Sequence, residues 1–174
     1  LNVPLKDGVV TDDGRVRASL PVIEKLAKAG ARVIVTAHLG RPKGKVDPQY
    51  SIAPAAARLA ELASVPVKVA TDLVGEDAKA KAAALADGEV LVVENVRYDA
   101  RETSKDDAER GEFADELVAL TGENGAYVND AFGAVHRKHA SVYDVAKRLH
   151  AYLGDLVKKE VDVLAKTLND PERP

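Results

Sequence analysis

Short runs of β-branched residues alternate with longer amphipathic stretches along most of this chain, and this alternation constrains the fold more than any other feature. The runs at 31–38, 65–70, 89–94 and 126–130 have the length and the Val content of buried strands. Strands separated by helices form βαβ units, in which the strands pair in parallel and helices cover both faces of the sheet. We therefore expect an α/β domain.

The helices expected between these strands have apolar residues spaced three or four apart. Ser51 is a candidate N-cap, and capping boxes are expected at Ser104 with Asp107 and at Ser141 with Asp144. The expected helical segments are 16–28, 52–62, 77–85, 107–120, 145–149 and 153–168. Together with the strands, they predict a three-layer αβα fold with a Rossmann-like parallel sheet.

Composition excludes several classes of function. The formal net charge of −3 gives the whole chain no attraction to nucleic acid or to anionic membranes. The absence of cysteine excludes disulfides, thiol catalysis and cysteine-ligated metals. No apolar run is long enough to span a membrane and no signal peptide is recognisable, so we expect a cytoplasmic protein with neither nucleic acid nor membrane as a partner.

Basic residues follow three of the four predicted strands. The first strand leads into His38, Leu39, Gly40 and Arg41, the third into Arg97, and the fourth into His136 and Arg137. In an open parallel sheet, ligands bind beyond the carboxyl ends of the strands, which all lie at one edge. Arg15, at the start of the first helix, adds a fourth arginine.

Four arginines at one edge repel each other unless an anion lies between them. The planar guanidinium group donates paired hydrogen bonds to a phosphate or a carboxylate, and each charge-assisted bond contributes roughly 1.5–3 kcal/mol. The sequence therefore predicts a site for a small ligand that carries both groups. Taken one at a time, these residues have simpler explanations: a single arginine can form a surface salt bridge, and Gly40 and Gly133 can be turn residues.

Other motifs are absent. The segment 40–45 has neither the glycine spacing nor the Ser or Thr of a Walker A loop, and no Gly-x-Gly-x-x-Gly follows a strand. The four histidines do not have the spacing of metal ligands, so we expect no metal site in this chain.

Several motifs, in order along the chain, resemble phosphoglycerate kinases. They are Asn2-Val-Pro-Leu5, Thr11-Asp-Asp-Gly-Arg-Val-Arg-Ala18, His38-Leu-Gly-Arg-Pro-Lys-Gly44, Glu94-Asn-Val-Arg97, Val128-Asn-Asp-Ala-Phe-Gly133 with His136-Arg137, and Asp170-Pro-Glu-Arg-Pro174. The stretch 136–143 most resembles actinobacterial members of the family.

The resemblance implies a glycolytic enzyme with two α/β domains, which moves a phosphoryl group between 1,3-bisphosphoglycerate and ADP. The residues it assigns to the 3-phosphoglycerate site are Asn2, Arg15, His38, Leu39, Gly40, Arg41, Arg97, His136 and Arg137. It further implies that Arg15 reaches the transferring phosphoryl group and is catalytic. Mg²⁺ with ATP or ADP is expected on the other domain, and the full enzyme is expected to be a monomer.

The resemblance also implies that the chain is incomplete. The family's first strand would precede Leu1, and the segment with the catalytic lysine and the nucleotide domain would follow Pro174. We therefore expect residues 1–168 to be an incomplete 3-phosphoglycerate-binding domain, residues 169–174 to be a hinge, and the isolated chain to be inactive. Two alternatives remain: a stand-alone binding module for phospho-sugar acids and a nucleotide-binding α/β domain.

Overall fold

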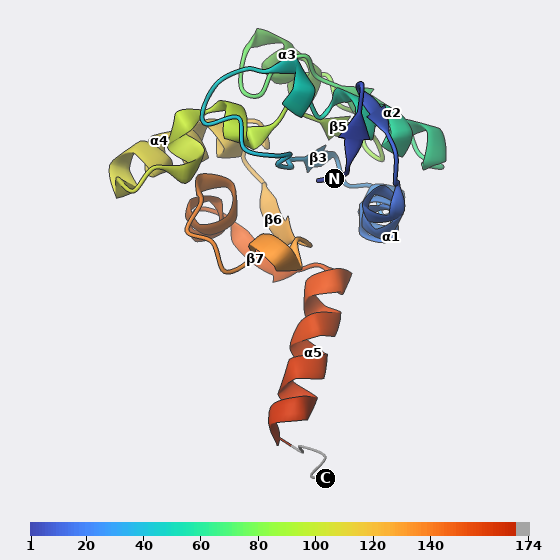
Figure 1. Cartoon of the computed structure of the whole chain (residues 1–174), viewed down its shortest axis with the longest axis vertical. Coiled ribbons are helices and arrows are strands. Elements are labelled where there is room, and N and C mark those ends of the chain that lie inside the picture. Colours follow the sequence, from blue (N-terminus) through green and yellow to red (C-terminus); the bar gives the residue numbers. More distant parts are fainter. Residues whose placement is uncertain (170–174) are drawn as a thin grey trace.

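The computed structural model describes residues 1–169, with side chains through residue 166 (Figure 1). Its centre is a parallel sheet in the order β3-β5-β4, formed by Val33–Val35, Val90–Val92 and Val67–Val69. A separate parallel pair joins β6 (Ala126–Asn129) to β7 (His150–Leu153). The four predicted strands are therefore present, although each is shorter than its apolar run, and the expected parallel α/β fold is confirmed.

The helices alternate with the strands as the sequence predicts. They are α1 (Gly14–Lys28), α2 (Ala53–Leu62), α3 (Glu76–Ala83), α4 (Asp107–Ala119) and α5 (Asp155–Asn169). Short 3-10 turns lie between them: η1 (Pro48–Tyr50), η2 (Val96–Tyr98), η3 (Ala100–Thr103), η4 (Phe132–Ala134) and η6 (Val145–Lys147). Residues 170–174, which include most of the expected hinge, lie outside the described part of the chain.

The central strand divides the core into two halves. Successive side chains of a strand point to opposite faces. Val90 and Val92 accordingly join the cluster formed with α1 and α2, whereas Leu91 and Val93 join the cluster formed with α3 and α4. All four side chains are almost fully buried. Because helices cover both faces of the sheet, the fold has three layers. Both faces of β5 are therefore buried, which explains why its sequence is an unbroken apolar run.

The segment 140–153 departs from the sequence prediction. The helix expected after Ser141 and Asp144 is instead a single π turn, η5 (Ala140–Asp144), followed by η6. Leu153, expected at the start of the last helix, lies in β7, and α5 begins at Asp155. Pairing with β6 satisfies the backbone groups of β7, and this partner is more than twenty residues away in the sequence.

Two helix caps also differ from the expectation. The N-cap of α4 is Asp106, whose carboxylate accepts hydrogen bonds from the amides of Ala108 and Glu109. Ser104 instead donates to the carboxylate of Glu109 at 2.6 Å. The N-cap of α2 is Ile52 rather than Ser51, although the hydroxyl of Ser51 accepts a hydrogen bond from the amide of Ala53 at 3.1 Å.

A small hairpin near the start of the chain was not predicted. It pairs β1 (Leu5–Lys6) with β2 (Val9–Val10) in antiparallel fashion. Asp7 and Gly8 form its turn, with φ values of 51° and 75°. Two positive φ angles are typical of a type I′ turn, for which Asp-Gly is a preferred sequence.

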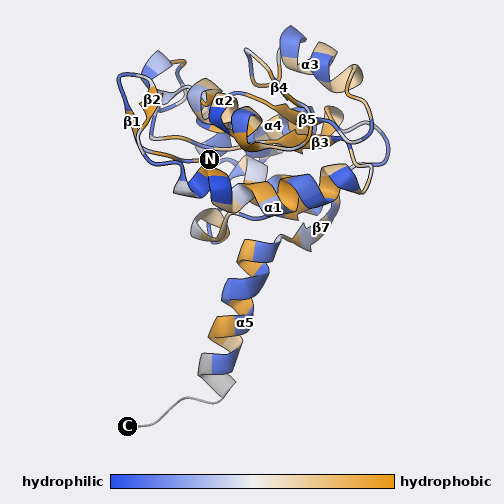
Figure 2. Ribbon diagram, turned by 90° about the vertical axis from the view of Figure 1, so that its right-hand side faces the viewer, coloured by the Kyte–Doolittle hydropathy of each residue, from blue (hydrophilic) through white to orange (hydrophobic). Residues whose placement is uncertain are grey.

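Helix α5 extends away from the rest of the molecule (Figure 1) and alternates apolar and polar residues along its length (Figure 2). Its first turn packs against the domain: Val157 is buried, whereas Val161 and Leu164 are about half exposed. In the described part of the chain, no helix is long and apolar enough to cross a membrane.

Candidate anion-binding site

The loop after β3 is fixed by a buried amide side chain from the loop after β5. Asn95 is fully buried, and its Nδ2 donates to the carbonyl oxygens of Leu39 and Tyr50 at 2.7 and 2.8 Å. Its Oδ1 accepts from the amides of Leu39 and Arg97 at 3.3 and 3.0 Å. Because both ends of this amide are satisfied, Asn95 locks the two loops together.

Leu39 and Gly40 support this loop. The Leu39 side chain is only 4% exposed and belongs to the core beside α1 and α2. The amide of Gly40 donates to Oδ1 of Asn2 at 3.4 Å, and its carbonyl accepts from Nη1 of Arg97 at 2.7 Å. Gly40 has a φ of +60°, and an added Cβ would overlap the ring of Tyr50, so only glycine fits.

Arg97 lies at the centre of a group of positive charges. Burial and the nearby guanidinium groups of Arg137 and Arg41 lower the pKa of Arg97. Its Nε is buried and has no hydrogen-bond partner among the described residues. A buried guanidinium group with an unused donor is costly unless a ligand accepts from it.

Arg15 reaches the same region from the start of α1. Its Nη1 donates to the backbone carbonyl of Asn2 at 2.5 Å, and the side chain of that residue accepts from Gly40. A shallow hollow of about 520 Å³ opens beside them and is lined by Asn2, Val3, Pro4, Asp12, Gly14 and Arg15. Asn2 thus connects Arg15 to the loop after β3.

The loop after β6 supplies the last arginine. The Nε of Arg137 is buried and, within the described residues, has no hydrogen-bond partner, as for Arg97. His136, the preceding residue, is exposed. His139 is half-buried, and burial together with the charges of Arg97 and Arg137 lowers its pKa. His139 is therefore a member of the site that the sequence analysis did not include.

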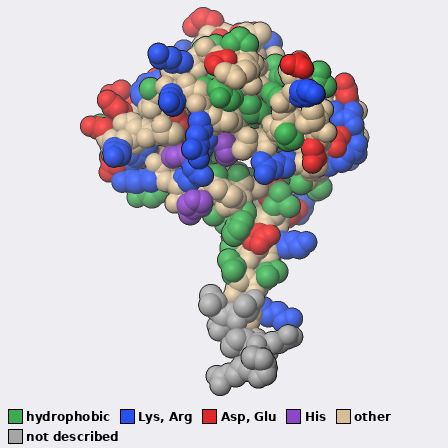
Figure 3. Space-filling view, viewed as in Figure 1, with side chains coloured by type: hydrophobic (Ala, Val, Ile, Leu, Met, Phe, Trp, Pro, Cys, Tyr) green, Lys and Arg blue, Asp and Glu red, His purple; other side chains and the backbone are tan. Residues whose placement is uncertain are grey.

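The first histidine of the site is uncharged at neutral pH. Burial and the charges of Arg97 and Arg137 lower the pKa of His38 to about 4. The neutral imidazole can donate one hydrogen bond without adding to the repulsion among the arginines. Figure 3 shows His side chains gathered among Lys and Arg side chains on the face seen in Figure 1.

Salt bridges separate the predicted site arginines from the others. Within the described part of the chain, a carboxylate lies within 4.0 Å of Arg17, Arg32, Arg58, Arg101, Arg110 and Arg148. None of the four predicted site arginines, Arg15, Arg41, Arg97 and Arg137, forms such a pair there. Among the described residues, the four predicted arginines therefore lack a carboxylate partner.

The donors gathered here suit an anion. Guanidinium, imidazole and amide N–H groups repel a cation and bind phosphate or carboxylate oxygens. Among residues 1–169 there is no cluster of three His, Cys, Asp or Glu side chains that could hold a metal ion.

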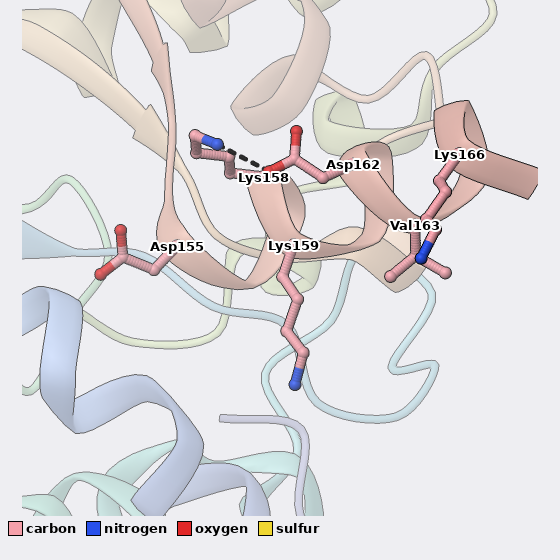
Figure 4. A pocket seen from close by; sticks show the side chains of 6 residues that line it. All are labelled: Asp155, Lys158, Lys159, Asp162, Val163 and Lys166. Carbon is pink, nitrogen blue, oxygen red and sulfur yellow. Dashed lines mark hydrogen bonds and ion pairs between the residues drawn. The ribbon is translucent and has the colours of Figure 1, made fainter. Parts of the chain in front are cut away.

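A second hollow lies along α5 and has a different character. Its walls are Asp155, Lys158, Lys159, Asp162, Val163 and Lys166, all from one helix (Figure 4). Lys158 pairs with Asp162 across one helical turn at 2.6 Å, and the lining contains no arginine or histidine. It has no contact with the arginine cluster and offers no enclosed space for a ligand.

Comparisons with known proteins agree with the motifs. The family model described as phosphoglycerate kinase matches residues 1–174. The phosphoglycerate kinase of Paenarthrobacter aurescens is 72% identical over 174 residues, and that of Nocardia farcinica is 61% identical over 175. Each match covers all of this chain and 43% of the relative. The expected resemblance to actinobacterial members is confirmed.

Solved structures of the family have the same fold. The crystal structure of phosphoglycerate kinase from Pyrococcus horikoshii superimposes with a TM-score of 0.83 at 31% identity, and that from Coxiella burnetii with 0.80 at 32%. Both comparisons cover the whole of this chain and 42% of the other. A family match from the first residue to the last, supported by close relatives and by the fold, shows that the chain belongs to the phosphoglycerate kinase family.

Proposed function

We propose that this chain carries the 3-phosphoglycerate site of a phosphoglycerate kinase. The observation that carries the proposal is the contrast among the arginines: four lack a carboxylate partner within the described residues, and two of these have a buried, unused Nε. They come from separate segments, yet contacts through Asn2 and Gly40 link Arg15 to Arg97, and the charges of Arg41 and Arg137 act on Arg97. A ligand with a phosphate at one end and a carboxylate at the other would use these donors.

The residues divide into two roles in this proposal. Arg41, Arg97 and Arg137 bind the phosphate or carboxylate oxygens of the ligand, with His38, His136 and His139 around them. Asn2, Leu39 and Gly40 hold the arginine-bearing loops. Arg15, at the edge of the cluster, is placed to stabilise the negative charge of a phosphoryl group in transfer.

The reaction follows from the family: a phosphoryl group moves between the carboxyl group of 3-phosphoglycerate and a nucleotide. Such a transfer requires mainly that the reactants be positioned and that charge on the transferring oxygens be stabilised. This chain would supply the positioning of the acid and one cationic group. More than half of the length of the matched relatives lies outside the matched part, and we propose that Mg-ATP binds there.

Calorimetric titration of the 174-residue chain with 3-phosphoglycerate tests this proposal. We expect binding that is weakened about 10- to 100-fold by Arg97→Ala, because one or two charge-assisted hydrogen bonds are lost. The matched control is Arg32→Ala, which removes an exposed guanidinium group already paired with Asp87 at 2.7 Å. The control should bind like the unchanged chain.

Titration with Mg-ATP separates the alternatives. We expect no binding of Mg-ATP by this chain, and no turnover when both substrates are present. Binding of Mg-ATP but not 3-phosphoglycerate would show a nucleotide domain, and equal weakening by Arg97→Ala and Arg32→Ala would remove the arginine cluster from the site.

A further inference from the structure

A buried carboxylate lies directly behind the arginine cluster. Glu102, on η3, is 1% exposed. Its two oxygens accept hydrogen bonds from the hydroxyl of Ser141 at 2.6 Å and from the amide of the same residue at 2.9 Å. Nδ1 of His139 lies 3.9 Å from the same carboxylate. Glu102 therefore fixes the start of η5, which follows the loop that carries Arg137.

The neighbours of Glu102 are charged groups of the site. The charge of Arg97 on η2 acts to lower the pKa of Glu102, and Glu102 in turn opposes the lowering of the Arg97 pKa by burial and by Arg137. Repulsion by Asp99 acts to raise the pKa of Glu102, and burial together with the charge of Glu102 raises the pKa of Tyr127 on β6. The other ionisable groups nearby are Asp144 and Arg110, which pair with each other at 2.9 Å, and Arg101, which pairs with Asp99 and Glu116.

Glu102 and a bound dianion compete for the same positive charge. With the site empty, an ionised Glu102 partly neutralises Arg97. With an anion bound there, the same carboxylate is a buried like charge next to the ligand. We propose that Glu102 is a positioning residue of the anion site, which holds the segment of His139 and Ser141 against Arg97 and whose protonation strengthens anion binding.

This inference rests on the proposed function, because it assigns Glu102 to the same site. Glu102 changes charge near neutral pH. Burial raises its pKa to about 7, although the hydrogen bonds from Ser141 and the charge of Arg97 oppose that shift. Above this pH the carboxylate is ionised and repels a bound anion. Below this pH the neutral acid does not repel it. By reciprocal linkage, a bound anion must raise the pKa of Glu102.

The test is a titration of the 174-residue chain with sulfate, which stays a dianion from about pH 5.5 to 8.5, the range in which a group of pKa about 7 changes charge. We expect the dissociation constant to rise about 5- to 30-fold as pH increases, the effect of one charge a few ångströms from the ligand. Glu102→Gln keeps an oxygen acceptor for Ser141 but cannot ionise. It should bind more tightly than the unchanged chain at about pH 8 and lose most of the pH dependence.

Carbon-13 NMR of the glutamate carboxyl groups gives a second measurement. The signal missing in Glu102→Gln should titrate near pH 7 and move to higher pH with saturating sulfate. Ser141→Ala removes a hydrogen bond to the carboxylate and should also raise the midpoint. His136→Asn controls for the exposed histidine of the site and should keep the pH dependence.

The outcomes distinguish the two proposals. Sulfate binding with an equal pH dependence in Glu102→Gln and in the unchanged chain, together with binding of 3-phosphoglycerate, would overturn the role of Glu102 and leave the proposed function intact. Absence of 3-phosphoglycerate binding at every pH would overturn both.

Discussion

At the scale of single residues, the site depends on a few positions that no other amino acid can fill. Asn95 makes four hydrogen bonds in a fully buried place, and no other side chain offers both an acceptor and two donors in that shape. Gly40 supplies backbone groups to both Asn2 and Arg97. The arginines that would contact the ligand are therefore positioned by uncharged residues.

Gly40→Ala should destabilise the fold more than the same change at Gly122. Both glycines have a positive φ, which costs alanine about 1–2 kcal/mol. An added Cβ meets the Tyr50 ring at Gly40 and open space at Gly122, so Gly40→Ala should cost about 1–3 kcal/mol more because of overpacking. Urea unfolding measures the two free energies. Equal losses would mean that the loop moves away from Tyr50 without penalty.

At the scale of elements, the loop after β6 and helix α5 share a hydrogen-bonded junction. The carboxylate of Asp130 accepts from the amide of Leu156 at 2.8 Å and also bonds the amide of Val157, so it caps a helix that begins twenty-five residues later. Burial raises the pKa of Asp130. Gly154 makes this contact possible, since a Cβ there would overlap the aspartate.

We expect Asp130→Ala to loosen the first turn of α5. The lost cap should cost about 1–2 kcal/mol, so the amides of Leu156 and Val157 should exchange with deuterium about 5- to 30-fold faster. Asp130→Asn retains an acceptor and should change little. Asp106→Ala is the matched control, because it uncaps α4 and should affect Ala108 and Glu109 only. Unchanged exchange at Leu156 in Asp130→Ala would show that the junction does not hold the helix.

At the scale of the whole molecule, the anion site should be linked to overall stability. An unliganded cluster of arginines is held together against its own repulsion, so a ligand that binds only the folded chain stabilises it. The cluster draws on the loops after β3, β5 and β6 and on α1, so ligand binding would connect the β3-β5-β4 sheet with the separate β6-β7 pair.

Thermal unfolding with increasing 3-phosphoglycerate should show this link. At about 100 times the dissociation constant, the gain is about 2.7 kcal/mol, which corresponds to roughly 5–10 °C for a domain of this size. The double variant Arg97→Ala, Arg137→Ala removes the binding donors and should show no shift. A shift of equal size in that variant would mean that the acid stabilises the protein without occupying this site.

How much of this the sequence could predict depends on how local the determining interactions are. Hydrophobic periodicity is a local property, so the alternation of strands and helices and the two-faced burial of β5 were predictable. Three of the four candidate arginines, Arg41, Arg97 and Arg137, were selected because they follow predicted parallel strands, whose carboxyl ends lie at one edge of a sheet. The family motifs added the residues in between.

The features that the sequence did not predict depend on contacts between residues that are distant in the sequence. The pairing of β6 with β7 and the hydrogen bonds between Glu102 and Ser141, at the π turn that precedes the expected helix 145–149, join segments far apart in the sequence. Arg101 and Arg97 are four residues apart, yet among the described residues only Arg101 of the two forms salt bridges, with Asp99 and Glu116. The sequence alone determined which chemical groups this protein has and at which edge of the sheet they gather. Only the tertiary structure decided which of these charges are paired within the protein and which are not, because Coulomb interactions depend on distance in space.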